Sequence, residues 1–236
     1  MTPYGKVVTE KIVGELASAG VVIISGLAYG VDAIAHKSAL DASGITVAIL
    51  GTPVESISPA GNRGLAQTML DRGGTIMSEF PKDRTVYPGN FVIRNRIVSG
   101  LCDALLITEA SLKSGSLHTA RYALEQGKTV MAVPGSVMSA SSEGTNNLIK
   151  TGAIPVTSAE DVFFALQMDT KQSKPKNFNG SPQEKRLLEL IREGVSDQEE
   201  LALASALEGP LVGSALTTLE LGGYIKPTGG GHWTAS

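Results

Sequence analysis

The segment "PGNFVIRNRIVSGL" groups arginine, asparagine and aromatic side chains within a few residues. Arg94 and Arg96 flank Asn95, and Phe91 lies three residues before Arg94. A guanidinium group binds phosphate oxygens in a bidentate manner, and an aromatic ring stacks on a nucleic-acid base. The combination predicts contact with a nucleic-acid strand. Ion pairing of the arginines with nearby glutamates and core packing of the phenylalanine are the structural alternatives.

Serine and glycine residues follow several apolar runs of the chain. Ser25 and Gly26 end one such run, and Ser114, Gly115 and Ser116 precede a helical pattern. Glycine lets the backbone approach a ligand closely, and the first N–H groups of a helix attract anions. Ordinary helix capping by serine is the alternative at each single position. Their convergence on one sheet edge would favour a phosphate-binding edge.

Signatures of catalysis are not found along the sequence. No strand is followed by a dinucleotide or Walker loop, and no nucleophile elbow is present. Cys102 is the sole cysteine and there are three histidines, so no metal-binding cluster is indicated. His36 follows Asp32 by one helical turn, and we expect the two to pair. Because Glu79 and Glu109 also have structural uses, we expect no catalytic residue, no metal and no cofactor.

Short strands and helices that would position these side chains alternate along the first part of the chain. Short apolar runs alternate with helical patterns, which indicates a doubly wound α/β domain with a mostly parallel sheet. Ligands bind such sheets beyond the carboxyl ends of the strands, where the serines and glycines fall. The expected strands are Val21–Ser25, Thr46–Gly51, Thr75–Ser78, Ala104–Thr108, Thr129–Val133 and Ile154–Val156, and the expected helices are Asp32–Ala42, Arg63–Arg72, Asn90–Gly100, Ser116–Gly127, Asn146–Thr151 and Ala159–Leu166.

A second, smaller domain is expected after this one. Residues 1–169 form the first domain, the polar and proline-containing residues 170–182 read as a linker, and residues 183–236 give three helical patterns followed by a hairpin, as in a winged helix. This last segment has four basic and eight acidic residues, and its third helix, Pro210–Leu221, has no lysine or arginine. Groove-binding helices need cations, so the sequence predicts a protein-contact domain.

Composition limits the function classes. The net charge of −3 argues against binding nucleic acid by bulk attraction, so any contact must be local. No apolar stretch reaches the roughly 20 residues of a membrane span, and the first residues do not resemble a secretory signal. With a single cysteine, a reducing cytoplasmic setting fits best.

Four blocks of the sequence resemble the DNA-processing protein A family (DprA, also called Smf). They read "SGLAYGVDAIAHKSAL", "SEFP" with "PGNFVIRNRIVSGL", "TEASLKSGSLHTARYALEQG", and "VPGSVMSASSEGTNNLIKTGA". The resemblance covers nearly all of residues 3 to 166. It implies an extended Rossmann-like fold and a non-enzymatic protein of bacterial natural transformation. Such a protein binds and protects incoming single-stranded DNA, helps load the RecA recombinase, and forms a homodimer through this domain.

The resemblance also assigns site residues. In the family, a basic pocket at the carboxyl edge of the sheet holds the DNA backbone. The matching positions here are Arg94, Asn95, Arg96, Phe91, Arg63 after "SPAGN", and Ser114, Gly115 and Ser116. Family members also have, just upstream of the segment matching "TPYG", a strand ending in Gly-Ser-Arg. This sequence starts without it, so we expect an interior position of the sheet to lack its strand.

Two alternatives from other functional classes remain. A winged-helix transcription regulator is the weaker one, because the third helix of the second domain has no lysine or arginine. The other alternative is an enzyme. Related Rossmann-like folds include nucleotide phosphoribohydrolases, which would make this protein a nucleotide-binding or nucleotide-hydrolysing enzyme. Those enzymes carry a PGGxGT loop with a following glutamate. Here the loop reads "SGSLHTA", with no acid until Glu125, which speaks against hydrolysis.

Overall fold

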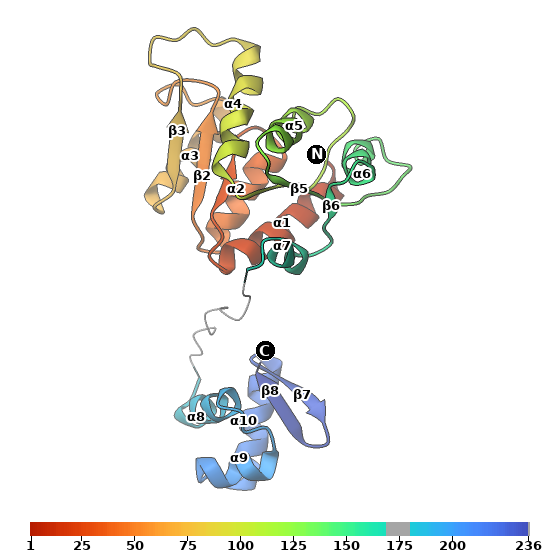
Figure 1. Ribbon diagram of the computed structural model, residues 1–236. Helices are drawn as coiled ribbons and strands as arrows, with labels where there is room; N and C mark the ends of the chain where they lie inside the picture. Colours follow the sequence, from red (N-terminus) through yellow and green to blue (C-terminus); the bar gives the residue numbers. More distant parts are fainter. Residues whose placement is uncertain (169–179, 236) are drawn as a thin grey trace. The chain divides into compact units, whose positions relative to one another are not determined.

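The computed structural model describes residues 1–168 and 180–235, which divide into two compact units (Figure 1). The contacts separate Met1–Gln172 from Ser173–Ser236. Most of the expected linker, residues 170–182, lies outside the described residues. Each unit is described by itself below.

The first unit is built on six parallel strands that follow the predicted order. They are β1 (Ile23–Ser25), β2 (Thr46–Leu50), β3 (Thr75–Ser78), β4 (Ala104–Ile107), β5 (Thr129–Ala132) and β6 (Ile154–Pro155). The strands form two three-stranded sheets, β1-β2-β3 and β4-β5-β6, with every pair parallel. The predicted parallel α/β class is therefore confirmed, and the strand ends differ from the prediction by two residues at most.

The two sheets each leave one strand with an open inner edge. Ile23 N–H donates to the carbonyl just before β2, so the alternation of a strand points the N–H and C=O of Ile24 away from β2. Likewise the carbonyl of Ile107 accepts from the residue after β5, which points the backbone groups of Leu106 away from β5. A cavity of about 630 Å³ is lined by both strands. Among the described strands, no backbone pairing joins the two sheets across this gap.

Helices cover the strands and join the two sheets. They are α1 (Pro3–Ser18), α2 (Val31–Asp41), α3 (Arg63–Asp71), α4 (Pro88–Leu101), α5 (Ser116–Glu125), α6 (Glu143–Lys150) and α7 (Ala159–Ala165), with a short 3₁₀ turn, η1 (Ala60–Asn62), before α3. Helix α1 buries Ile12 and Leu16 in a cluster that also includes Ile23 of β1 and Leu106 of β4. Through these contacts, α1 packs against both β1 and β4 and so spans the gap between the two sheets.

Among the described residues, α1 is the α-helix that the sequence pattern did not predict. Its run Val7-Val8-Thr9 is β-branched, which is typical of a strand. Its start carries a clear signal, because the Thr2 side chain accepts a hydrogen bond from Gly5 N–H and Pro3 occupies the first turn.

The second unit has the predicted winged-helix order. Helices α8 (Pro182–Arg192), α9 (Gln198–Ser205) and α10 (Gly209–Leu221) precede an antiparallel hairpin of β7 (Ile225–Gly229) and β8 (His232–Ala235). Its core contains the buried side chains of Leu187, Leu201 and Leu216, with Trp233 packed against them. None of the helices in either described range is long and apolar enough to cross a membrane.

Candidate nucleic-acid interface

The predicted site residues gather at the carboxyl edge of the strands. The cavity between β1 and β4 is lined by eight of the ten, namely Ser25, Gly26, Phe91, Arg94, Asn95, Ser114, Gly115 and Ser116. Arg63 and Arg96 do not line it. Segments that lie far apart in the sequence are therefore brought to one rim, as the strand order requires.

Arg94 is buried, and its guanidinium group faces inward. The side chain is 4% exposed, and its Nη1 donates to the carbonyls of Gly26, at 2.7 Å, and of Ile49. Burial lowers the pKa of the Arg94 guanidinium, and the nearby carboxylate of Asp32 opposes this effect. Arg94 thus ties the ends of β1 and β2 to α4, and only part of it remains for a ligand.

Asn95 and Arg96 point to different neighbours. Asn95 accepts a hydrogen bond from Arg94 Nε, and its Nδ2 lies 3.5 Å from the carbonyl of Gly115, which brings α4 beside the serine-glycine loop. Arg96 is half exposed and forms an ion pair with Glu79 after β3. The ion-pairing alternative therefore applies to Arg96.

Phe91 and Arg63 present an aromatic face and a free cation. Phe91 is half-buried and packs on Gly51, where an added Cβ would lie 2.7 Å from Phe91 Cδ1. Arg63 is exposed at the first position of α3, and among the described residues its side chain makes no hydrogen bond or ion pair. Arg63 is free to meet a phosphate.

The serine-glycine loop forms the start of α5. Ser114 Oγ lies 2.7 Å from Ser116 Oγ and accepts from Ser116 N–H at 3.4 Å. Gly115 is exposed, and nothing lies within 4 Å of the position that its Cβ would take. The two serines thus contact each other, α5 has no side-chain cap at Gly115, and open space remains above Gly115 for a ligand.

Two side chains that the sequence analysis did not assign to the site hold the turn after β1. The Asp32 carboxylate accepts from the N–H groups of Gly26, at 3.1 Å, and Ala28, at 3.2 Å. Asn62 donates through Nδ2 to the carbonyls of Leu27, at 2.8 Å, and Ala28, at 3.3 Å. Because the Gly26 N–H is already bonded to Asp32, it is not available to a phosphate.

His36 does not pair with Asp32 as expected. Its Nδ1 lies 2.6 Å from Thr46 Oγ1, and the imidazole is fully buried. Burial lowers the pKa of His36 to about 4, an effect larger than the opposing influence of Asp32. Within residues 1–168 and 180–235, no three His, Cys, Asp or Glu side chains are grouped as a metal site would require.

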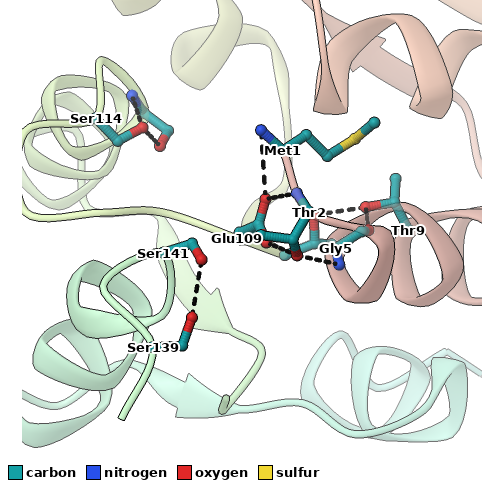
Figure 2. A network of polar contacts seen from close by, with 10 residues as sticks. Met1, Thr2, Gly5, Thr9, Glu109, Ser114, Ser139 and Ser141 are labelled. Atoms are coloured by element: carbon teal, nitrogen blue, oxygen red, sulfur yellow. Dashed lines mark hydrogen bonds and ion pairs between the residues drawn. The ribbon is translucent and has the colours of Figure 1, made fainter. Parts of the chain in front are cut away.

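Glu109 is engaged at the start of α1 (Figure 2). Its carboxylate accepts from Thr2 N–H at 2.8 Å and from the Thr2 hydroxyl, and it lies 3.7 Å from the terminal amine of Met1. The neighbouring Thr9 hydroxyl contacts Thr108 Oγ1 at 2.7 Å. Figure 2 also places the paired serines Ser139 and Ser141 below this group and Ser114 beside it. Glu109 therefore has a structural role, like Asp32 and Glu79.

Comparison with known proteins identifies the family. The profile described as DNA recombination-mediator protein A matches residues 1–167, and that of the DprA winged helix domain matches residues 171–231. The chain belongs to this family. It is 41% identical to Protein Smf of Escherichia coli (strain K12) over 226 residues, covering 92% of this chain and 60% of that protein. It is 40% identical to the DNA processing protein DprA of Bacillus subtilis (strain 168) over 165 residues, covering 70% of this chain and 55% of that protein.

Solved structures agree with the family assignment. DprA from Streptococcus pneumoniae has a TM-score of 0.64 at 36% identity, over 70% of this chain and 57% of that one. DprA from Helicobacter pylori, whose structure concerns its single-stranded DNA binding mode, has a TM-score of 0.63 at 36% identity, over 71% of this chain and 75% of that one. The chain thus spans 55–60% of the two curated relatives named above.

Proposed function

We propose that this protein binds single-stranded DNA along the carboxyl edge of its strands and holds it without cleaving it. The observation that carries the proposal is that eight predicted site residues line the cavity between β1 and β4, and that these residues end or follow the two strands or lie on α4. Single-stranded DNA binding by the Helicobacter pylori relative supports the choice of ligand.

The available groups at the rim suit a sugar-phosphate strand. Arg63, which lies outside the cavity at the start of α3, supplies a cation with no competing carboxylate among the described residues, and Asn95 and Ser114–Ser116 supply hydrogen-bond donors. Phe91 supplies an aromatic ring on which a base stacks. Arg94 contributes mainly by fixing the rim, since its Nη1 bonds to two strand-end carbonyls.

Holding is favoured over chemistry because the acids near the rim are occupied. Asp32 is bonded to two backbone N–H groups, Glu79 to Arg96, and Glu109 to Thr2. A general acid or base needs a carboxylate within reach of the substrate proton. These contacts support a binding protein over a nucleotide hydrolase.

We further propose the biological setting that the family resemblance implies. The protein protects incoming single strands during bacterial natural transformation and helps load RecA recombinase on them. It works in the cytoplasm as a homodimer formed through the Rossmann-like unit. The acidic winged-helix unit makes protein contacts, because its third helix has no basic residue.

Fluorescence anisotropy with a labelled dT oligonucleotide of about 12 nucleotides tests the binding proposal. We expect affinity to fall steeply between about 50 and 200 mM salt. Arg63→Ala should weaken binding by about three- to tenfold and reduce the salt slope by about 1.

Arg72→Ala is the matched control. It removes the same charge from the other end of α3, where Arg72 donates to the carbonyl of Leu40. Absence of oligonucleotide binding by the parent protein, or equal losses in Arg63→Ala and Arg72→Ala, would contradict the proposal.

A further inference from the structure

The turn that follows β1 is fixed by an unusual number of side-chain contacts. Asp32 binds the N–H groups of Gly26 and Ala28, Arg94 binds the carbonyl of Gly26, and Asn62 binds the carbonyls of Leu27 and Ala28. Five backbone groups in three consecutive residues are thus held by side chains from three different helical segments. These contacts over-determine the backbone of the turn.

The conformation that these contacts impose is strained. Leu27 has a φ of 59° although it is not glycine, and its side chain is completely buried. A left-handed backbone disfavours branched and bulky residues, and it persists only where the surrounding structure over-determines it. Strain of this kind concentrates at binding sites, so the exposed residue that follows the turn is a candidate for contact with a ligand.

That residue is Tyr29. It is 69% exposed although it is a large aromatic side chain on a rigid turn. It lines the same cavity as Phe91, Asn95 and Ser114. The strained turn therefore displays an aromatic ring at the rim where the DNA strand is proposed to lie.

The ring of Tyr29 rests on a floor formed by η1. An added Cβ on Gly61 would lie 2.8 Å from Tyr29 Oη and 3.2 Å from Cε1, so a side chain there would push the outer end of the ring aside. The next two residues are Asn62, which holds the turn, and Arg63, whose guanidinium is free among the described residues. Residues 61–63 thus contact the ring, hold the backbone of the turn before Tyr29 through Asn62, and supply the cation of Arg63.

We propose that Tyr29 is a base-stacking residue for a single strand bound at this rim. The inference rests on the proposed function and deepens it. A ring that lies against Gly61 on one side and is exposed elsewhere offers a face to a base and loses less conformational entropy on binding than a side chain with no neighbour. The adjacent Arg63 meets the phosphate of the same or a neighbouring nucleotide.

The test compares a dT oligonucleotide of about 12 nucleotides with an abasic deoxyribose-phosphate strand of equal length, using anisotropy. Tyr29→Ala should bind the dT strand about tenfold more weakly and the abasic strand within twofold of the parent. Tyr29→Phe should bind both strands like the parent, since the ring is kept. Gly61→Ala should weaken dT binding less than Tyr29→Ala does, because the new methyl group shifts the outer end of the ring but does not remove the ring.

Phe164→Ala serves as the control for loss of an exposed aromatic residue, because Phe164 is 87% exposed on α7 and does not line the cavity. If the parent binds dT and Tyr29→Ala binds it equally well, or loses both strands to the same extent, the role of Tyr29 is overturned while the binding proposal stands. If the parent binds neither strand, the proposed function fails and this inference fails with it.

Discussion

Replacement of Arg94 should lower the stability of the first unit, because Arg94 acts mainly through its buried hydrogen bonds. Its Nη1 donates to the carbonyls of Gly26 and Ile49, and the residue is 4% exposed. A hydrogen bond from a charged donor contributes about 1.5–3 kcal/mol, and each buried carbonyl left without a partner costs about 1–3 kcal/mol. Relief from burying the guanidinium offsets part of this loss. Arg94→Ala should therefore lower the free energy of unfolding of the first unit by about 3 kcal/mol.

Arg96→Ala is the matched comparison on the same helix. Arg96 is 48% exposed in its ion pair with Glu79, and exposed pairs contribute about 1 kcal/mol or less. Its removal should leave the stability of the first unit nearly unchanged.

Urea unfolding followed by two probes separates the units. Trp233 is the sole tryptophan and packs in the core of the second unit, so its fluorescence reports on that unit. Circular dichroism reports on the helices of both units. The dichroism change that does not coincide with the Trp233 transition belongs to the first unit. Arg94→Ala should move the midpoint of that change to a lower urea concentration. Equal midpoints for Arg94→Ala and Arg96→Ala would refute the structural reading of Arg94.

Three further predictions concern other parts of the chain. Because the folded-state pKa of His36 is about 4 and its ordinary value is 6.5, the unfolded state binds more protons between these pH values. Stability should fall by about 3 kcal/mol as the pH drops through this window, and His36→Gln, compared with the parent by urea unfolding at each pH, should remove that loss. Gly144→Ala should destabilise the first unit in thermal melts, since the new Cβ would lie 2.7 Å from two backbone carbonyl oxygens, whereas Gly14→Ala, with nothing within 4 Å, should stabilise α1 by about 1 kcal/mol. Arg186→Ala in the acidic second unit should leave oligonucleotide affinity within twofold, and a larger loss by anisotropy would assign that unit a DNA-binding role.

Alternation of apolar runs and helical patterns was enough to predict the parallel sheet and the winged-helix order. The pattern works because buried parallel strands are short and apolar, and each crossover requires a helix. Helix α1 escaped detection because its β-branched residues obscured the helical period. The capping Thr2 and the following Pro3 were the signals that identify it.

The roles of individual polar residues were harder to predict. Asn90, Arg94 and Val98 are spaced by four, and all three are buried, so the helical period shows that Arg94 faces the sheet while Arg96 does not. The partners of Asp32 and Asn62 had no such signal. They bind backbone groups of a turn, and backbone groups leave no trace in residue types.

The open edges of β1 and β4 affect where the first unit opens locally. Among the described strands no backbone ladder joins the two sheets, so their connection depends on packing by α1 and α4. Amides of Ile24 and Leu106 should exchange with deuterium well before those of Ala48 and Met131, each flanked by strands on both sides. Ser25 ends β1 and Ser114 follows β4, so they lie on the two sides of the gap between the sheets. A DNA strand bound to both sides would hold the two sheets together and slow the exchange of these amides.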